Sequence, residues 1–221
     1  MTHVEIRVRG SHVVTLPPER ATVHATVAQD GPEAESVFQA VAVVLDRVRS
    51  SIGERHHPKK GPIVRYAIDQ VRLGSHRPWN ADGQQLPLVH TAAVSIEATF
   101  VDFEDLARWV AWAAGVGGLS IGYVNWDLSE EKRRKVERTA RQKAVRDAAR
   151  RAQDYADALG LGSVQPRGIN DPGVGAPVQH KVRMASAVAA PAASPPQIIL
   201  RPEDVEISAE VEAFFVVHTP R

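Results

Sequence analysis

Residues 129–159 read SEEKRRKVERTARQKAVRDAARRAQDYADAL and are followed by Gly160. These 31 residues contain no Gly or Pro, start with a Ser and two glutamates, and stop just before a Gly. A capping Ser, acids in the first turn and a Gly past the end are typical of a helix. At 1.5 Å per residue the helix would be about 46 Å long. We predict one uninterrupted helix here and interpret the rest of the chain around it.

Most apolar positions of this predicted helix are small. They include a row with a spacing of four: Val136, Ala140, Ala144, Ala148, Ala152 and Ala156. Such a row turns by about 40° at each step, so neighbours such as Val145 and Ala149 are needed to keep one face apolar. Small side chains let a helix backbone lie close to its partner. We therefore predict a structural helix packed tightly against a sheet or another subunit.

The other faces of this helix carry ten basic and six acidic residues. A basic face can bind nucleic acid or another polyanion, and the candidate contacts are Arg138, Arg141 and Arg146. The spacing also predicts i,i+4 ion pairs: Glu131–Lys135, Glu137–Arg141 and Asp147–Arg151. Tyr155 is the one aromatic residue of the stretch, so there is no stacking platform for bases. We favour the structural role and keep polyanion binding as the alternative.

The composition restricts the chemistry of the chain. It has 27 basic and 26 acidic residues, which is not the balance of a dedicated nucleic-acid binder, and no Cys, which excludes disulfides and thiol catalysis. The start of the sequence does not resemble a signal peptide, and no run of 18 apolar residues occurs. We therefore expect no membrane span and a cytoplasmic protein.

Alternation of apolar and polar residues predicts strands, and apolar residues three or four apart predict two shorter helices. The strands cover residues 4–8, 21–27, 63–73, 92–100, 119–123, 164–169 and 205–217, and the helices cover about 32–53 and 102–114. Within these, the order β-α-β-β-α-β predicts an α+β fold, an antiparallel sheet with helices on one face. We expect a single domain over residues 1–221. The long helix and the C-terminal strand are added to its core, and that strand should pair with the same sheet.

Two further stretches lead to weaker predictions. Residues 170–197 are rich in Pro and Ala and lack bulky apolar residues, so we expect a mobile loop. Trp109 and Trp112 lie next to the apolar stripe of their helix, where core packing is favoured and a subunit contact is the alternative. Trp79 lies in the turn Arg77-Pro78-Trp79-Asn80 and is the best candidate for an exposed contact.

No stretch carries a motif for catalysis or metal binding. The nine histidines show no metal-ligand spacing, and the sequence has no Gly-x-Ser-x-Gly motif. The glycines at 115–118 end a helix rather than begin one, so they offer no phosphate-binding helix start. We expect no enzymatic activity, no catalytic residue, no cofactor and no metal.

The order of these patterns resembles the SIMPL-domain family, which includes bacterial periplasmic immunogenic proteins. The residues that carry the resemblance are VEIRVRG (4–10), LPPERATVHATVAQDG (16–31), HTAAVSIEATFVDFEDLARWV (90–110) and ARQKAVRDAARRAQDYADALGLG (140–162). The resemblance implies a non-enzymatic, often oligomeric protein linked to envelope or oxidative stress. We therefore expect a self-associating, stress-related protein with no defined biochemical activity; the resemblance names no protein partner.

Overall fold

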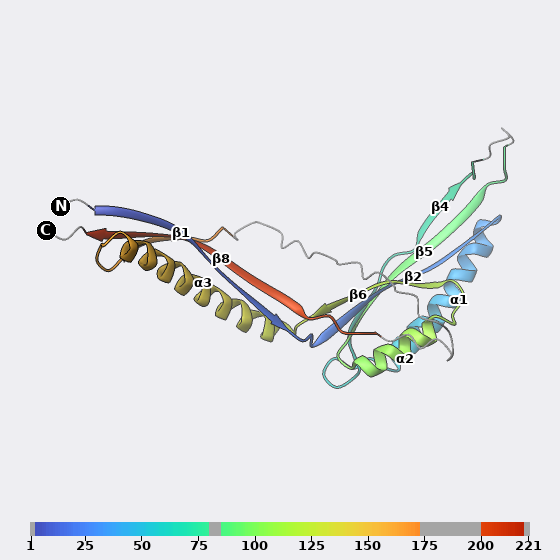
Figure 1. The fold of residues 1–221 in the computed structure, drawn as a ribbon. Helices are drawn as coiled ribbons and strands as arrows, with labels where there is room; N and C mark the ends of the chain where they lie inside the picture. The colour runs from blue at the N-terminus through green and yellow to red at the C-terminus, as the bar shows by residue number, and fades with distance from the viewer. Residues whose placement is uncertain (1–2, 80–84, 173–199, 219–221) are drawn as a thin grey trace, which may run out of the picture. The chain divides into compact units, whose positions relative to one another are not determined.

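The computed structural model describes residues 3–79, 85–172 and 200–218, which form three helices and eight strands (Figure 1). The α+β fold class is thus confirmed. The predicted loop at about 170–197 lies outside the described residues, apart from its first three. Where the sequence predicts one domain, the chain divides into two compact units. We call Pro18–Asp127 with Ala193–Glu203 the split-βαβ unit, and Met1–Pro17, Leu128–Ala192 and Asp204–Arg221 the long-helix unit.

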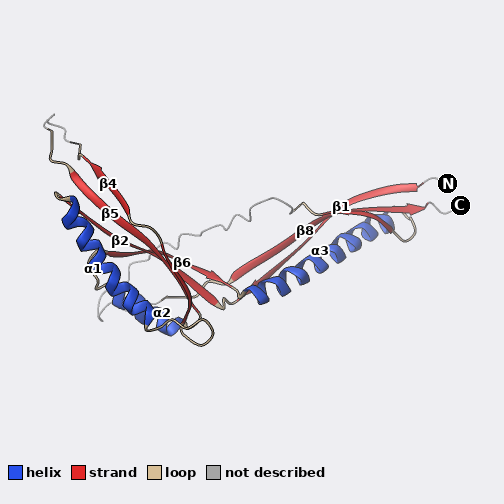
Figure 2. Cartoon of the chain, turned by 180° about the vertical axis from the view of Figure 1, so that it is seen from behind, coloured by secondary structure: helices blue, strands red, loops and turns tan. Residues whose placement is uncertain are grey.

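The split-βαβ unit has the predicted order of elements. They are β2 (Arg20–Gly31), α1 (Ala34–Gly53), β3 (Ile63–Ile68), β4 (Arg72–His76), β5 (Val89–Phe100), α2 (Phe103–Ala113) and β6 (Leu119–Asp127). The sheet is antiparallel in the order β3-β5-β2-β6, and both helices cover one of its faces (Figure 2). The predicted strand over 63–73 is instead two strands, β3 and β4, and both pair with β5.

The core of this unit lies between the sheet and its two helices. Alternate residues of β2 and β5, such as Val23 and Ile96, face α1 and α2 and are fully buried. Asp102 caps α2 by accepting hydrogen bonds from the backbone N–H groups of Glu104 (2.9 Å) and Asp105 (3.0 Å). These bonds satisfy two of the donors that a helix start leaves unpaired. The buried faces of these strands and the start of α2 therefore follow from local sequence patterns.

The long-helix unit holds β1 (His3–Leu16), α3 (Glu130–Ala158), β7 (Gln165–Asn170) and β8 (Val205–His218). Its sheet has the order β1-β8-β7, and β1 pairs with β8 from His3↔His218 to Leu16↔Val205. The prediction that the last strand joins the sheet of the β-α-β-β-α-β core is therefore wrong. The small-residue row of α3 needs an apolar face to cover it, and β1 and β8 form that face together.

The ends of α3 agree with the prediction to within one residue. Ser129 is the N-cap, and its Oγ accepts a hydrogen bond from the backbone N–H of Lys132 (3.3 Å). At the other end Gly160 has a φ of 68°, Gly160 N–H donates to Asp157 O (3.0 Å) and Leu161 N–H donates to Ala156 O (2.8 Å). This pair of bonds is the Schellman motif, which favours Gly at the left-handed position.

The small-residue row packs directly on the β1–β8 pair. Its five alanines have no exposed surface, and Val136 is 9% exposed. At Gly10 the β1 backbone lies so close to α3 that an added Cβ would be 2.7 Å from the Cβ of Ala148 and 2.5 Å from its N, and would also meet Ala144 O. The predicted tight packing against a sheet is confirmed, because only small side chains fit this approach.

Candidate contact surfaces

The hairpin formed by β4 and β5 carries two large apolar side chains that are more than half exposed. We call residues 71–79 and 85–91 the hairpin arm. Trp79 is 87% exposed and Leu73 is 67% exposed. Arg77 Nη1 donates a hydrogen bond to Leu86 O (2.9 Å), which links the two sides of the loop. The predicted exposed contact at Trp79 therefore lies on an arm that carries a second exposed apolar residue.

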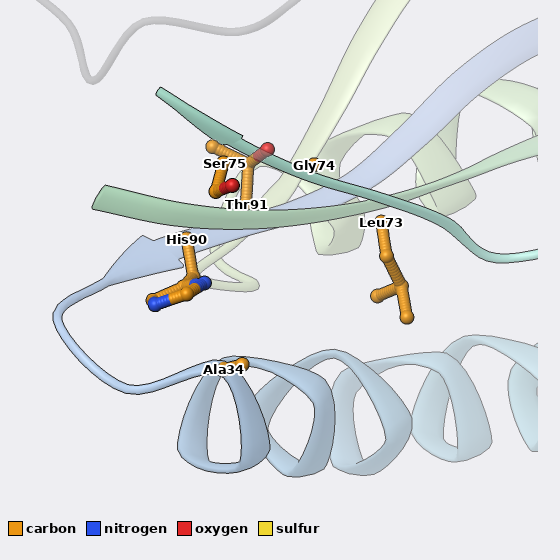
Figure 3. Close-up of a pocket in the computed structure, with 6 residues that line it drawn as sticks. All are labelled: Ala34, Leu73, Gly74, Ser75, His90 and Thr91. Carbon is orange, nitrogen blue, oxygen red and sulfur yellow. The ribbon is translucent and has the colours of Figure 1, made fainter. Parts of the chain in front are cut away.

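A surface pocket of about 290 Å³ lies between the hairpin arm and the start of α1. Its lining residues are Ala34, Leu73, Gly74, Ser75, His90 and Thr91. Figure 3 shows the side chains of Leu73 and His90 pointing toward the start of α1, whereas the side chain of Thr91 points to the opposite side of the hairpin. Pockets for drug-sized ligands hold about 300–1,000 Å³. The volume here is at the lower limit and suits a single large side chain.

Opposite charges flank the two sides of this pocket. Glu33 and Glu35 adjoin Ala34 at the start of α1 and are exposed. Arg72 and Arg77 lie on the hairpin arm and are exposed as well. Within the described part of the chain, none of these four side chains forms an ion pair with another residue. Each of them makes a hydrogen bond to a neutral group: Glu33 accepts from Ser36, Glu35 accepts from Gln39, Arg72 donates to Ser95 and Arg77 donates to Leu86 O. Their charges can still pair with those of a second molecule.

Trp109 and Trp112 differ from Trp79. Trp109 has no exposed surface and packs against Phe100, with ring centroids 5.8 Å apart. It fills the core, so it is not available to a second subunit, and this corrects the alternative reading of that residue. Trp112 is partly buried against the core, and the guanidinium of Arg47 lies 5.7 Å from its ring centroid. Only Trp79 of the three presents most of its side chain to solvent.

The ion pairs of α3 differ from the predicted set in one case. Glu131–Lys135 (2.5 Å) and Asp147–Arg151 (3.0 Å) form as predicted. The hydrogen bond and charge of Glu131 raise the pKa of Lys135. The predicted pair Glu137–Arg141 is wrong, because Glu137 pairs with Arg133, which lies one turn before it in the helix. Glu137 Oε1 is 4.0 Å from Arg133 Nη1.

The middle of α3 consequently has unpaired cations. Residues 138–146 contain no acid, and Arg138, Arg141, Lys143 and Arg146 are all exposed. Among the described residues these four side chains have no ion-pair partner. The candidate polyanion contacts Arg138, Arg141 and Arg146 therefore lie on one helix segment with a charge of +4. Lys143 is a further cation of this segment, and the lack of acids between residues 138 and 146 is the signal that marks it in the sequence.

Two further arginines of α3 are tied to β1 through Asp147. The carboxylate of Asp147 accepts hydrogen bonds from the backbone N–H of Ser11 (3.2 Å) and from Arg150 (2.6 Å). The bond from Ser11, followed by Arg150 and Arg151, lowers the pKa of Asp147 below its usual value. Arg151 also donates to the backbone carbonyl of Arg9 (3.2 Å). These side chains occupy the open edge of β1 and so have a structural role.

One family model matches the residues that form nearly all of these elements. Residues 6–215 match the family model SIMPL, described as "Protein of unknown function (DUF541)". The chain belongs to the SIMPL family. Ile6 and Phe215, the first and last matched residues, pair with each other across β1 and β8, so the SIMPL sequence contains both units. A search of curated proteins finds no match.

In the described ranges of this SIMPL chain, no helix combines the length and the apolar character that a membrane span requires. Its three helices have other partners. The helices α1 and α2 bury one face on the sheet of the split-βαβ unit, and α3 buries its small-residue row on β1 and β8.

The sheet face away from the helices of the SIMPL chain brings three polar or aromatic side chains together. His24 Nδ1 lies 3.3 Å from Glu97 Oε1, and the ring of His24 stacks on Tyr123 with centroids 4.2 Å apart. In the next row, the hydroxyls of Thr22 and Thr99 share a hydrogen bond of 3.0 Å. We interpret these contacts as cross-strand pairs that stabilise the sheet.

The sequence of this SIMPL chain predicts the exposure of Trp79 but not the pocket at the start of α1. The lining residues come from the start of α1, from β4 and from the start of β5. Leu73 was expected within a longer strand, and Ala34 and His90 gave no signal of their own. The turn residues between residues 72 and 91 indicate a loop in the sequence. The packing of the hairpin over the start of α1 has no such local signal.

Proposed function

We propose that this SIMPL protein is non-catalytic and associates with itself through the hairpin arm. The observation that carries the proposal is the exposure of Trp79 and Leu73 on one hairpin arm, where Leu73 also lines a pocket. Exposed apolar clusters mark interaction sites, and Trp is enriched among the residues that dominate binding energy. The pocket itself offers the imidazole of His90 and the hydroxyl of Ser75 as polar groups, which suits binding better than catalysis.

The size of the apolar contribution sets the expected affinity. A buried aromatic side chain removes about 150–250 Å² from water. At about 25 cal/mol per Å², one Trp contributes roughly 4–6 kcal/mol. Association costs roughly 4–15 kcal/mol in lost freedom, so one Trp is not enough for a stable complex. Two copies of Trp79 and Leu73 in one interface would supply about twice as much, and we expect a dissociation constant on the order of micromolar.

Light scattering over a range of protein concentrations tests the proposal. The mass of the wild-type chain should rise above that of the 24.1 kDa monomer as the concentration increases through the micromolar range. Trp79→Ala should remain monomeric, because it removes the main apolar contact. Tyr155→Ala is the matched control, since Tyr155 is an aromatic residue with 59% exposure on α3. A wild-type chain that stays monomeric throughout would contradict the proposal.

A second candidate function is polyanion binding by α3. The observation that favours it is the +4 segment over residues 138–146, whose cations have no acidic partner within the described residues. Each phosphate that a cation neutralises adds to an affinity that falls with salt concentration. Glu137 would have neutralised part of this segment, but it pairs with Arg133 instead.

Binding of single-stranded DNA or heparin at about 50 mM salt tests this candidate. The double substitution Arg138→Glu and Arg146→Glu should abolish binding, because it reverses two unpaired cations. The control is Arg134→Glu with Lys135→Glu, which changes the net charge equally but at cations that already have acidic partners. If the wild-type chain does not bind at low salt, or if both doubles weaken binding equally, this surface is not the binding site.

A further inference from the structure

We propose that Trp79 of a second copy of this chain occupies the pocket beside the start of α1, and that the two copies exchange their Trp79 side chains reciprocally. This inference rests on the proposed self-association and assigns it an anchor, a receiving pocket and a symmetry.

The pocket suits an indole in both size and chemistry. Its volume of about 290 Å³ accommodates one large side chain. Ala34 and Leu73 offer apolar surface to the ring, while the imidazole of His90 and the hydroxyl of Ser75 are polar groups at the same site (Figure 3). A buried indole N–H needs an acceptor, which a hydroxyl or an imidazole nitrogen supplies. Trp79 is 87% exposed, so its own ring does not fill this pocket.

Charge complementarity supports a second copy as the occupant. Arg77 lies two residues before Trp79, so it enters the interface with that ring. Glu33 and Glu35 flank Ala34 at the wall of the receiving pocket. Arg77 uses one N–H group on Leu86 O, and its other donors remain available to a carboxylate. When Trp79 of one copy enters the pocket of the other, Arg77 of the first copy approaches Glu33 and Glu35 of the second. Among the described residues, these two carboxylates form no ion pair within their own chain.

Because the anchor and the pocket lie on one arm, two copies can exchange their Trp79 side chains about a two-fold axis, and this is the symmetry that we propose. Each copy offers a Trp79 and receives one, so the same patch serves on both sides. Such an interface is isologous and closes as a two-fold dimer, whereas a head-to-tail arrangement would continue into larger assemblies. The expected association therefore stops at the dimer, and its two Trp contacts form together.

The lack of Cys in the chain permits a direct test by disulfide formation. One full-length variant carries Pro78→Cys, next to the anchor, and another carries Ala34→Cys, at the pocket wall. When the two are mixed and oxidised, a cross-linked dimer should form well above the level of either variant alone. The matched control replaces Ala34→Cys by Val43→Cys, which is 70% exposed on the same helix but outside the pocket. Circular dichroism first verifies that each variant is folded.

Trp79→Ala in the Pro78→Cys chain provides the second arm of the test. It should reduce the cross-linked yield at least about tenfold, because a loss of 1.4 kcal/mol already corresponds to tenfold in affinity. Equal yields with Ala34→Cys and Val43→Cys, or an unchanged yield without Trp79, would overturn the pocket assignment. If the wild-type chain still associates in light scattering in that case, self-association stands and only its anchor is wrong. A monomeric wild-type chain would overturn both.

Discussion

Gly10 brings the backbone of β1 against the backbone of α3. Any side chain at this position meets Ala148 N and Ala144 O, which belong to a helix backbone and cannot move aside as a flexible side chain would. We predict that Gly10→Ala lowers the free energy of unfolding by about 3 kcal/mol, the upper part of the usual range for overpacking. Urea denaturation followed by circular dichroism measures this change.

Gly162→Ala is the control for Gly10→Ala. A Cβ at residue 162, in the same unit, would meet no atom within 4 Å. Its free energy of unfolding should stay close to that of the wild-type chain. Equal stability of the two variants would show that β1 and α3 do not approach each other as closely as described.

Asp147 connects a helix to the open edge of a strand by charge as well as by hydrogen bonds. Its pKa is lowered in the folded state, so its carboxylate stabilises the fold above the usual value of 3.8. This contribution is lost as the pH falls from 3.8 through the lower folded-state pKa. Asp147→Asn should therefore be less stable than the wild-type chain at neutral pH, and the difference should narrow in acid.

Urea midpoints measured from neutral pH to below the folded-state pKa check the Asp147 prediction. Asp154→Asn is the control, because Asp154 is exposed on the same helix. A stability difference between wild type and Asp147→Asn that does not change with pH would mean that the ionic contribution of this carboxylate is small.

At the scale of the element, α3 was the most predictable part of the chain. Its first and last turns carry their own signals, because Ser129 caps the start and Gly160 allows the left-handed turn at the end. The ion pairs along its surface were less predictable. Glu137 has a cation four residues away in each direction, Arg133 and Arg141, and the sequence does not distinguish between them.

Gly160→Ala tests the helix end. A residue with a Cβ pays about 1–2 kcal/mol for a left-handed backbone, and Gly160 has a φ of 68°. We predict a loss of about 1 kcal/mol in the free energy of unfolding. Because Gly162 does not have a positive φ, Gly162→Ala again serves as the comparison. If Gly160→Ala is as stable as Gly162→Ala, α3 ends in another way in solution.

At the scale of the whole molecule, the two units have separate cores. The buried residues of the split-βαβ unit lie between Ala21 and Val116, within one continuous stretch of chain, and Leu200 packs partly buried against their core. We predict that residues 18–127 fold by themselves, because they contain a complete sheet and both of its helices. Circular dichroism of this fragment should show helix and strand signals and a cooperative thermal transition. A fragment without such a transition would show that the long-helix unit is needed for its stability.

The long-helix unit is built differently, because its strands come from both ends of the chain. β1 starts at His3 and pairs over its full length with β8, which ends at His218. Removal of either end therefore removes one of the two strands that cover α3. This arrangement also explains why the SIMPL match spans residues 6–215, since a shorter sequence would lack one of the two paired strands.

The sequence by itself determined the helices, the inward faces of the strands and the exposure of Trp79, because caps, periodicity and turn residues act within a few positions of the chain. Only the tertiary structure decided that β8 pairs with β1, and that the hairpin arm and the start of α1 form a pocket. The physical reason is that alternation specifies which face of a strand is buried but not which strand lies beside it. Partner choice depends on the total apolar surface that distant segments cover together, and here the small-residue row of α3 required both ends of the chain.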